Sequence, residues 1–171
     1  MDDFAAYDGL GLAQLVRNKQ VSPLELVEES IARIEKNDGQ LNAVVYRAFD
    51  EARREAQGEL PDGAFCGVPF LMKDLYSEVA GMPRTSGSRF LKDEVCAEDS
   101  ELTRRYRAAG VVIVGKTNTP EFGITGTTES ALLGPCRNPW NPLHIAGGSS
   151  GGSAAATAAG MVPLAHASDG L

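Results

Sequence analysis

The sequence predicts an α/β fold, and three observations lead to this prediction. Helical patterns alternate along the 171 residues with short apolar strand patterns. One segment, residues 22–39, has its apolar residues at three- and four-residue spacing, which is typical of a helix with one buried face. Another, "VVIVG" at 111–115, is apolar throughout and rich in β-branched residues, which is typical of a buried strand. No internal repeat or domain boundary interrupts the pattern, so a single domain is expected.

The first elements are helical. A helix is expected around Leu10 to Asn18, and a more regular one follows it. Ser22 can cap this second helix, Pro23 suits its first position, and Glu25 completes a capping box. The run "NDG" at 37–39 is expected to end it.

The middle of the chain alternates between strand and helix patterns. A short strand is expected at 41–46 and a helix at 49–57. The segment "GVPFLMKD" at 67–74 places apolar residues at alternate positions, a strand pattern that ends at Lys73. The segment 98–110 predicts another helix, with Asp99 as its N-cap and Gly110 just past its end.

The last third is less regular. After the strand at 111–115, residues 117–148 are rich in Gly, Pro, Asn and Thr and are expected to form mostly ordered loop. The small residues of "AAATAAG" at 154–160 are compatible with a tightly packed helix.

Composition and charge exclude several classes of partner. Hydrophobic residues make up 43% of the chain and charged residues 23%, as in ordinary soluble domains. The net charge of −7 argues against a nucleic-acid surface, which needs clustered Lys and Arg. The acidic start has no apolar signal region, and the apolar run at 153–167 is broken by Gly160 and Pro163. Neither a nucleic acid nor a membrane is therefore expected as a partner.

The cysteines predict neither disulfides nor a metal site. Cys66, Cys96 and Cys136 are odd in number and far apart, and no C-x-x-C motif occurs. With only His144 and His166 as histidines, the sequence shows no cluster of metal ligands. Reduced thiols in a cytoplasmic protein are the expectation.

One motif suggests a nucleotide site. Residues 110–117, "GVVIVGKT", match the P-loop pattern in full. A P-loop, however, needs a preceding strand and a loop of backbone N–H groups between its glycines, and the four intervening residues here are stiff strand formers. The interpretation as a P-loop nucleotide-binding module is therefore disfavoured against a helix end, a core strand and a lysine, Lys116, at the strand end.

The glycine- and serine-rich segment at 147–153, "GGSSGGS", leaves three interpretations open. Its composition suits a flexible linker. Glycines before a helix also let the backbone approach a ligand closely, and the first turn could face an anion. The third interpretation is a catalytic loop, and the residue chemistry alone does not choose among them.

Five segments in order resemble the amidase signature family, serine hydrolases that cleave carboxylic amides. The resemblance covers residues 22–169, nearly the whole chain. Its motifs are "GVPFLMKD", "GVVIVGKTNTPEFG", "GPCRNPWNP", "GGSSGGSAAATAAG" and "PLAHASD". The residues between them are most similar to bacterial amidases, including those that open cyclic amides of nylon oligomers. The ammonia-releasing subunit of glutamyl-tRNA amidotransferase is a related match.

The resemblance implies a fold and a function. It implies the amidase signature fold, a mixed β-sheet flanked by helices, with residues 1–171 as the amino-terminal part of a single amidase domain, incomplete at the C-terminus. It implies hydrolysis of a non-peptide C–N bond in a small linear or cyclic amide, with no cofactor. It also allows a homodimer of the full-length protein.

The resemblance assigns roles to individual residues. It implies that Lys73 is the general base, which requires a buried, neutral amine; without the resemblance, a solvated strand-end charge is the simpler interpretation. Ser149 matches the serine that follows a cis peptide bond and relays a proton between the lysine and the nucleophile. Ser150 matches a supporting residue near the lysine, and the resemblance implies a supporting role for Asp169 as well. Ser153 is expected to pack in the helix.

The sequence departs from the family at its end. The family continues from Asp169 as D-x-G-G-S, where the backbone N–H groups form the oxyanion hole and the last serine is the nucleophile. Here Gly170 and Leu171 occupy the start of that segment, with leucine in place of a glycine, and the nucleophile position falls two residues beyond. The chain alone is therefore expected to be inactive. The alternative is a non-catalytic amidase-like protein, or a half that a partner chain completes.

Overall fold

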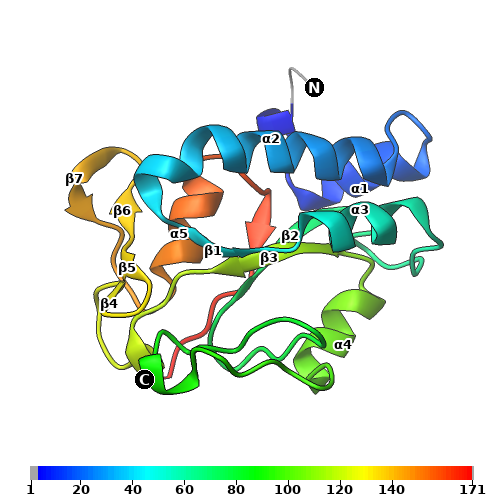
Figure 1. Ribbon diagram of the computed structural model, residues 1–171. Helices are drawn as coiled ribbons and strands as arrows, with labels where there is room; N and C mark the ends of the chain where they lie inside the picture. The colour runs from blue at the N-terminus through cyan, green and yellow to red at the C-terminus, as the bar shows by residue number, and fades with distance from the viewer. Residues whose placement is uncertain (1–3, 171) are drawn as a thin grey trace.

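The centre of the molecule is a mixed four-stranded sheet. The computed structural model describes residues 4–170. The sheet contains β1 (Val44–Arg47), β2 (Pro69–Lys73), β3 (Val112–Thr117) and β8 (Leu164–Ala165), in the order β1-β3-β2-β8 (Figure 1). β1 runs antiparallel to β3, whereas β2 runs parallel to both β3 and β8. The mixed α/β sheet is confirmed, and β8 is an addition to the strands predicted from the sequence.

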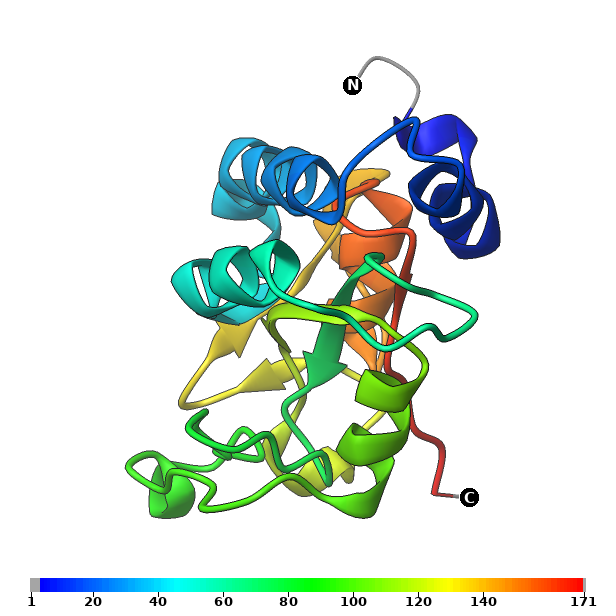
Figure 2. The same ribbon diagram turned by 90° about the vertical axis from the view of Figure 1, so that its right-hand side faces the viewer.

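Helices cover both faces of this sheet. One side carries α2 (Pro23–Leu41), α3 (Phe49–Gln57) and α5 (Gly151–Ala158), and the other carries α4 (Glu101–Ala108) together with the long loop that follows β2 (Figures 1 and 2). Helix α1 (Gly9–Arg17) packs against α2 through a separate apolar cluster that contains Leu12 and Leu26. Because other elements pack on both faces of the sheet, all five residues of β2 are buried.

The start of α2 is as predicted, but its end is not. Ser22 and Glu25 form the full capping box, with Pro23 in the first turn. The helix continues through the expected stop at 37–39 and ends at Leu41, because Asn42 adopts a left-handed conformation with φ 51°. The Asp38 carboxylate then accepts hydrogen bonds from the N–H groups of residues 43 and 44.

The expected N-cap of α4 is wrong by one residue. The Ser100 hydroxyl accepts the hydrogen bond from Thr103 N. Asp99 instead accepts from Ala80 N at 2.8 Å and forms an ion pair with Arg107. At the other end, Gly110 follows the helix with φ 90°, as predicted.

Residues 117–148 contain more structure than expected. Beside the short 3-10 helix Glu121–Gly123, two small ribbons form: β4 (Glu129–Ser130) with β5 (Gly134–Pro135), and β6 (Arg137–Asn138) with β7 (Asn141–Ile145). Every residue of β7 is exposed. A strand with no buried face needs no alternation of apolar and polar residues, which is the pattern that would have predicted it. Two further 3-10 helices span Phe4–Ala6 and Arg89–Leu91.

The structure removes the P-loop interpretation. Residues 112–117 form β3 and are all buried, so the segment offers no loop of free N–H groups to a phosphate. Among residues 4–170, no helix is long and apolar enough to cross a membrane. The three cysteines are free thiols.

Candidate active site

Lys73 lies in the protein interior at the carboxyl end of β2. Its side chain has no exposed surface. Its Nζ donates hydrogen bonds to Ser149 Oγ at 2.8 Å and to Ser168 Oγ at 2.9 Å. The interpretation of Lys73 as a solvated strand-end charge is therefore wrong.

The surroundings of Lys73 favour the neutral amine. Burial lowers the pKa of Lys73 from 10.5 to about 8, although attraction to Asp169 opposes this change. A buried amine within hydrogen-bond distance of a hydroxyl is the arrangement that a general base requires.

The segment around Ser149 is held in place by the loop at 119–128. The peptide bond between Gly148 and Ser149 is cis, as the resemblance implies. Thr119 Oγ1 donates to the Ser149 carbonyl oxygen at 3.2 Å, and Thr128 Oγ1 donates to the Gly147 carbonyl oxygen at 2.8 Å. A segment fixed in this way is an ordered part of a site rather than a flexible linker.

Ser150 bonds the backbone of Ser168. Its Oγ accepts from Ser168 N and donates to the Ser168 carbonyl oxygen, both at 3.2 Å. Ser150 occupies the N-cap position of α5, but its side chain makes no capping hydrogen bond. It therefore contacts the backbone of the residue that bonds Lys73, not Lys73 itself.

Ser153 packs inside the molecule, as expected, and also joins three elements. Its Oγ lies 2.7 Å from Thr117 Oγ1 at the end of β3 and donates to the His166 carbonyl oxygen at 2.6 Å. Ser153 thus ties α5 to β3 and to the segment that leads to Ser168.

Ser168 is the residue that the sequence analysis missed. It lies in the recognised "PLAHASD" motif, yet no role was assigned to it. Its position directly before Asp169 was the available signal. The contact with Lys73 spans 95 positions in the sequence, so it is visible only once β8 has placed this segment beside β2.

Three of these residues, Ser149, Ser150 and Ser168, line a cavity of about 900 Å³. Asp169 and Gly170, the expected supporting and oxyanion-hole residues, both line it, whereas Leu171 lies outside the described residues. The cavity is lined by Leu75, Tyr76, Phe122, Gly123, Ile124, Thr125, Gly126, Ala146, Gly148, Ser149, Ser150, Gly151, Ala154, Ser168, Asp169 and Gly170. Asp169 is the only charged residue in this lining, so the described wall is largely neutral.

His166 is a buried neutral group near the site. Burial, together with the charges of Lys73 and Lys116, lowers the pKa of His166 to about 4. Its ring lies 5.9 Å from that of Tyr106. Among residues 4–170, no group of three His, Cys, Asp or Glu side chains could hold a metal ion.

Comparison with known proteins gives consistent matches. A protein-family model described as "Amidase" matches residues 25–170. The 6-aminohexanoate-cyclic-dimer hydrolase of Paenarthrobacter ureafaciens is 44% identical over 164 residues, which is 95% of this chain and 33% of that protein. The lipoamidase of Enterococcus faecalis is 40% identical over 98% of this chain and 23% of its own length. The chain spans about a third of the length of the first of these relatives.

Solved structures agree with the sequence matches. A 6-aminohexanoate cyclic dimer hydrolase complexed with substrate superposes with a TM-score of 0.91 at 43% identity, covering 96% of this chain and 34% of that one. A bacterial aryl acylamidase of the amidase signature family superposes with a TM-score of 0.87 at 45% identity, covering 93% of this chain and 34% of that one.

Proposed function

The chain belongs to the amidase family, and on this premise we propose that the full-length protein hydrolyses carboxylic amides by a Ser–cis-Ser–Lys mechanism. The observation that supports the proposal is the 2.8 Å hydrogen bond between Lys73 Nζ and Ser149 Oγ beside the cavity. Lys73 acts as general base and Ser149 as proton relay. The family pattern places the nucleophilic serine two positions beyond Leu171.

In this mechanism the nucleophilic serine gains the acyl group and loses its proton to Lys73 through Ser149. The nucleophilic serine attacks the amide carbonyl and passes its proton to Ser149 Oγ, while Ser149 passes its own proton to the neutral Lys73 amine. The same route returns a proton to the leaving amine as the C–N bond breaks and an acyl-enzyme remains. Water, deprotonated along this route, then attacks the acyl-enzyme. The ester bond to the nucleophilic serine breaks, the serine regains its proton from Lys73 through Ser149, and the carboxylic acid is released. Backbone N–H groups of the segment that begins at Gly170 stabilise the oxyanion.

The test compares two lysines in the full-length protein. Lys73→Ala should lower kcat for an aryl amide by at least about a hundredfold, because the relay loses its base. Lys92→Ala is the matched control, since Lys92 is 55% exposed and pairs with its neighbour Asp93. Equal activity in the two variants would refute the mechanism.

We also propose that residues 1–171 alone do not hydrolyse amides. Lys73 and Ser149 then have no nucleophile to activate. The measurement is incubation of the chain with an aryl amide and a serine-reactive probe, and turnover with a labelled serine contradicts the proposal. If a separately supplied carboxy-terminal half restores turnover, the alternative of a half completed by a partner chain gains support.

The substrate proposed is a small, linear or cyclic carboxamide. The largely neutral wall of the described cavity supports this class, as does similarity to a protein named 6-aminohexanoate-cyclic-dimer hydrolase. A cytoplasmic location is proposed from the three free thiols. Turnover of the 6-aminohexanoate cyclic dimer and of an acyl anilide, compared with glutamine, tests the substrate class.

A further inference from the structure

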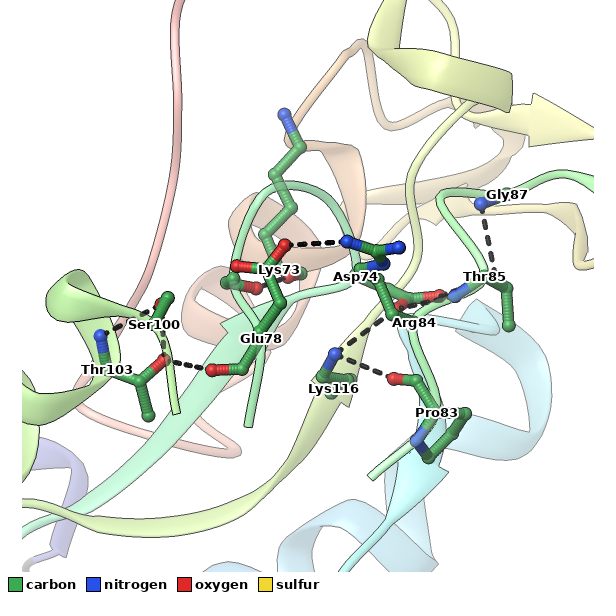
Figure 3. Close-up of polar contacts among 11 residues, drawn as sticks. Lys73, Asp74, Glu78, Pro83, Arg84, Thr85, Gly87, Ser100, Thr103 and Lys116 are labelled. Atoms are coloured by element: carbon green, nitrogen blue, oxygen red, sulfur yellow. Dashed lines mark hydrogen bonds and ion pairs between the residues drawn. The ribbon is translucent and has the colours of Figure 1, made fainter. Parts of the chain in front are cut away.

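Lys116, the lysine of the motif that imitates a P-loop, has no part in the mechanism above, yet it is fully buried. Its partner is Asp74, which is 2% exposed and directly follows Lys73. Lys116 Nζ lies 3.4 Å from Asp74 Oδ1 and donates to the Pro83 carbonyl oxygen at 2.7 Å (Figure 3). The Lys73 side chain extends away from this cluster (Figure 3).

The pair lies on the opposite side of the sheet from the Lys73 amine. Lys116 is in register with Met72 on β2, one residue before Lys73. Because side chains alternate along a strand, Met72, Lys116 and Asp74 face the α4 side, whereas Lys73 faces α5. The two buried lysines at the strand ends thus have different partners: a carboxylate for Lys116, and two hydroxyls for Lys73.

Asp74 also binds the loop that follows β2. Its carboxylate accepts hydrogen bonds from Thr85 N, at 3.2 Å to each oxygen, and from Thr85 Oγ1 at 2.5 Å. Thr85 Oγ1 in turn accepts from Gly87 N at 3.1 Å. Lys116, Asp74 and Thr85 therefore join the end of β2, the end of β3 and the loop at 83–87.

The loop at 83–87 packs against residues 119–122, next to the cavity wall that residues 122–126 form. Phe122 N donates to the Ser86 carbonyl oxygen at 2.8 Å, and Ser88 Oγ donates to Glu121 Oε1 at 2.7 Å. At Gly87, an added Cβ would lie 2.8 Å from the Thr119 carbonyl oxygen, so the two segments pack backbone against backbone. Phe122 to Gly126 line the cavity, and Thr119 bonds the Ser149 carbonyl oxygen.

A buried ion pair is a poor source of net stability, because the cost of removing two charges from water offsets their attraction. Its best-supported role is to select one arrangement of the segments that it joins. Here those segments are the strand end that carries Lys73 and the loop that supports the cavity wall.

From these contacts we propose that Lys116, Asp74 and Thr85 form a positioning network for the active site. The network fixes the backbone of Lys73 and the position of residues 119–126, which include the cavity wall at 122–126 and Thr119, the residue that bonds the Ser149 carbonyl oxygen. None of the three residues touches the substrate or moves a proton. The inference rests on the proposed function, which supplies the reaction whose geometry the network sets.

The test uses Thr85 because two variants separate its hydroxyl from its volume: valine keeps the volume without the hydroxyl, and serine keeps the hydroxyl without the methyl group. In the full-length protein, Thr85→Val removes the hydroxyl that donates to Asp74, whereas Thr85→Ser retains it. Thr85→Val should raise KM and lower kcat, together reducing kcat/KM by about ten- to a hundredfold. Thr85→Ser should remain within about threefold of the unmodified protein, as a rescue by the conservative variant.

Hydrogen exchange provides a second measurement that does not depend on activity. Thr85→Val and Lys116→Met should both speed amide exchange in residues 119–126 while leaving β3 protected. Glu101→Gln, which removes an exposed ion pair with Arg105, is the control for both measurements.

Unchanged exchange at 119–126 in both variants overturns the proposal, as does loss of stability without any change in kcat or KM. If the unmodified full-length protein hydrolyses no amide, the proposed function fails, and the exchange measurement still decides whether the network positions the wall.

Discussion

At the residue scale, burial changes the acid–base properties of the Lys73 amine. A lysine at a strand end is ordinarily charged and solvated, but here its amine is enclosed and bonded to two hydroxyls. The lowered pKa of Lys73 is a direct consequence of this burial. Two predictions follow from this pKa.

The first prediction concerns the pH dependence of activity. In the proposed mechanism only the neutral Lys73 amine accepts a proton. On that mechanism, kcat/KM of the full-length protein should rise as the pH rises through about 8. Asp169→Asn should move this rise to lower pH, because attraction to Asp169 raises the pKa of Lys73. A pH profile of both proteins checks the prediction, and a shift to higher pH in the variant contradicts it.

The second prediction concerns stability. The folded-state pKa of Lys73 lies below its unfolded value, so below about pH 8 the folded chain carries an unfavourable buried charge. Lys73→Met should therefore raise the free energy of unfolding at neutral pH by about 1–3 kcal/mol. This gain should diminish as the pH rises from about 8 toward 10.5.

Urea unfolding of Lys73→Met at several pH values measures this effect. A stability difference that does not change with pH would show that the charge is not its cause. Lys92→Met is the control, because that lysine is 55% exposed.

At the element scale, the glycines of two helices have opposite roles. Gly39 lies within α2, and apart from its chain neighbours and the backbone of its own helix no atom lies within 4 Å of the place where a Cβ would stand. Gly152 lies in α5, where an added Cβ would come within 2.3 Å of Asn118 N and 2.7 Å of the Ala43 carbonyl oxygen. Gly39 therefore only weakens α2, whereas Gly152 allows α5 to pack closely against the backbone of Asn118 and Ala43.

The third prediction uses this matched pair. Gly39→Ala should stabilise the chain by about 0.5–1 kcal/mol, because alanine loses less conformational entropy in a helix. Gly152→Ala should destabilise it by about 1–3 kcal/mol, because the backbone at Asn118 and Ala43, or that of α5, must shift. Denaturant unfolding of both variants is the measurement, and equal effects of the two substitutions would contradict the prediction.

At the scale of the whole molecule, the ribbon of β6 and β7 projects from the side of the sheet (Figure 1). On it, Trp140 is 86% exposed and Leu143 is 89% exposed. Large apolar side chains that are exposed together favour association between molecules.

The fourth prediction is that residues 1–171 self-associate through this ribbon. The double variant Trp140→Ser/Leu143→Ser should increase the monomer fraction at a given concentration, because it removes the apolar surface. Light scattering over a concentration series measures this. Phe90→Ser is the control, since Phe90 is 89% exposed but lies outside the ribbon; an equal gain in that variant would mean that the ribbon has no special role.

Neighbouring residues were enough to predict the local elements, and five motifs in order were enough to recognise the family. The capping box of α2, a buried strand and the glycine after α4 were all predictable, because each depends on neighbouring residues. The strand was expected at 111–115 and lies at Val112–Thr117. The resemblance singled out Lys73 and Ser149, and the structure places their side chains 2.8 Å apart.

The contacts between distant side chains could not be predicted in this way. The bond from Lys73 to Ser168, the pair of Lys116 with Asp74, and the use of Ser100 rather than Asp99 as a helix cap were not predicted. Each depends on how segments far apart in the chain pack together. Asp99, for example, turns to Ala80 and Arg107 because the loop after β2 passes beside α4. Local patterns set what each segment becomes, whereas burial between segments sets the charge and the partners of the groups at the site.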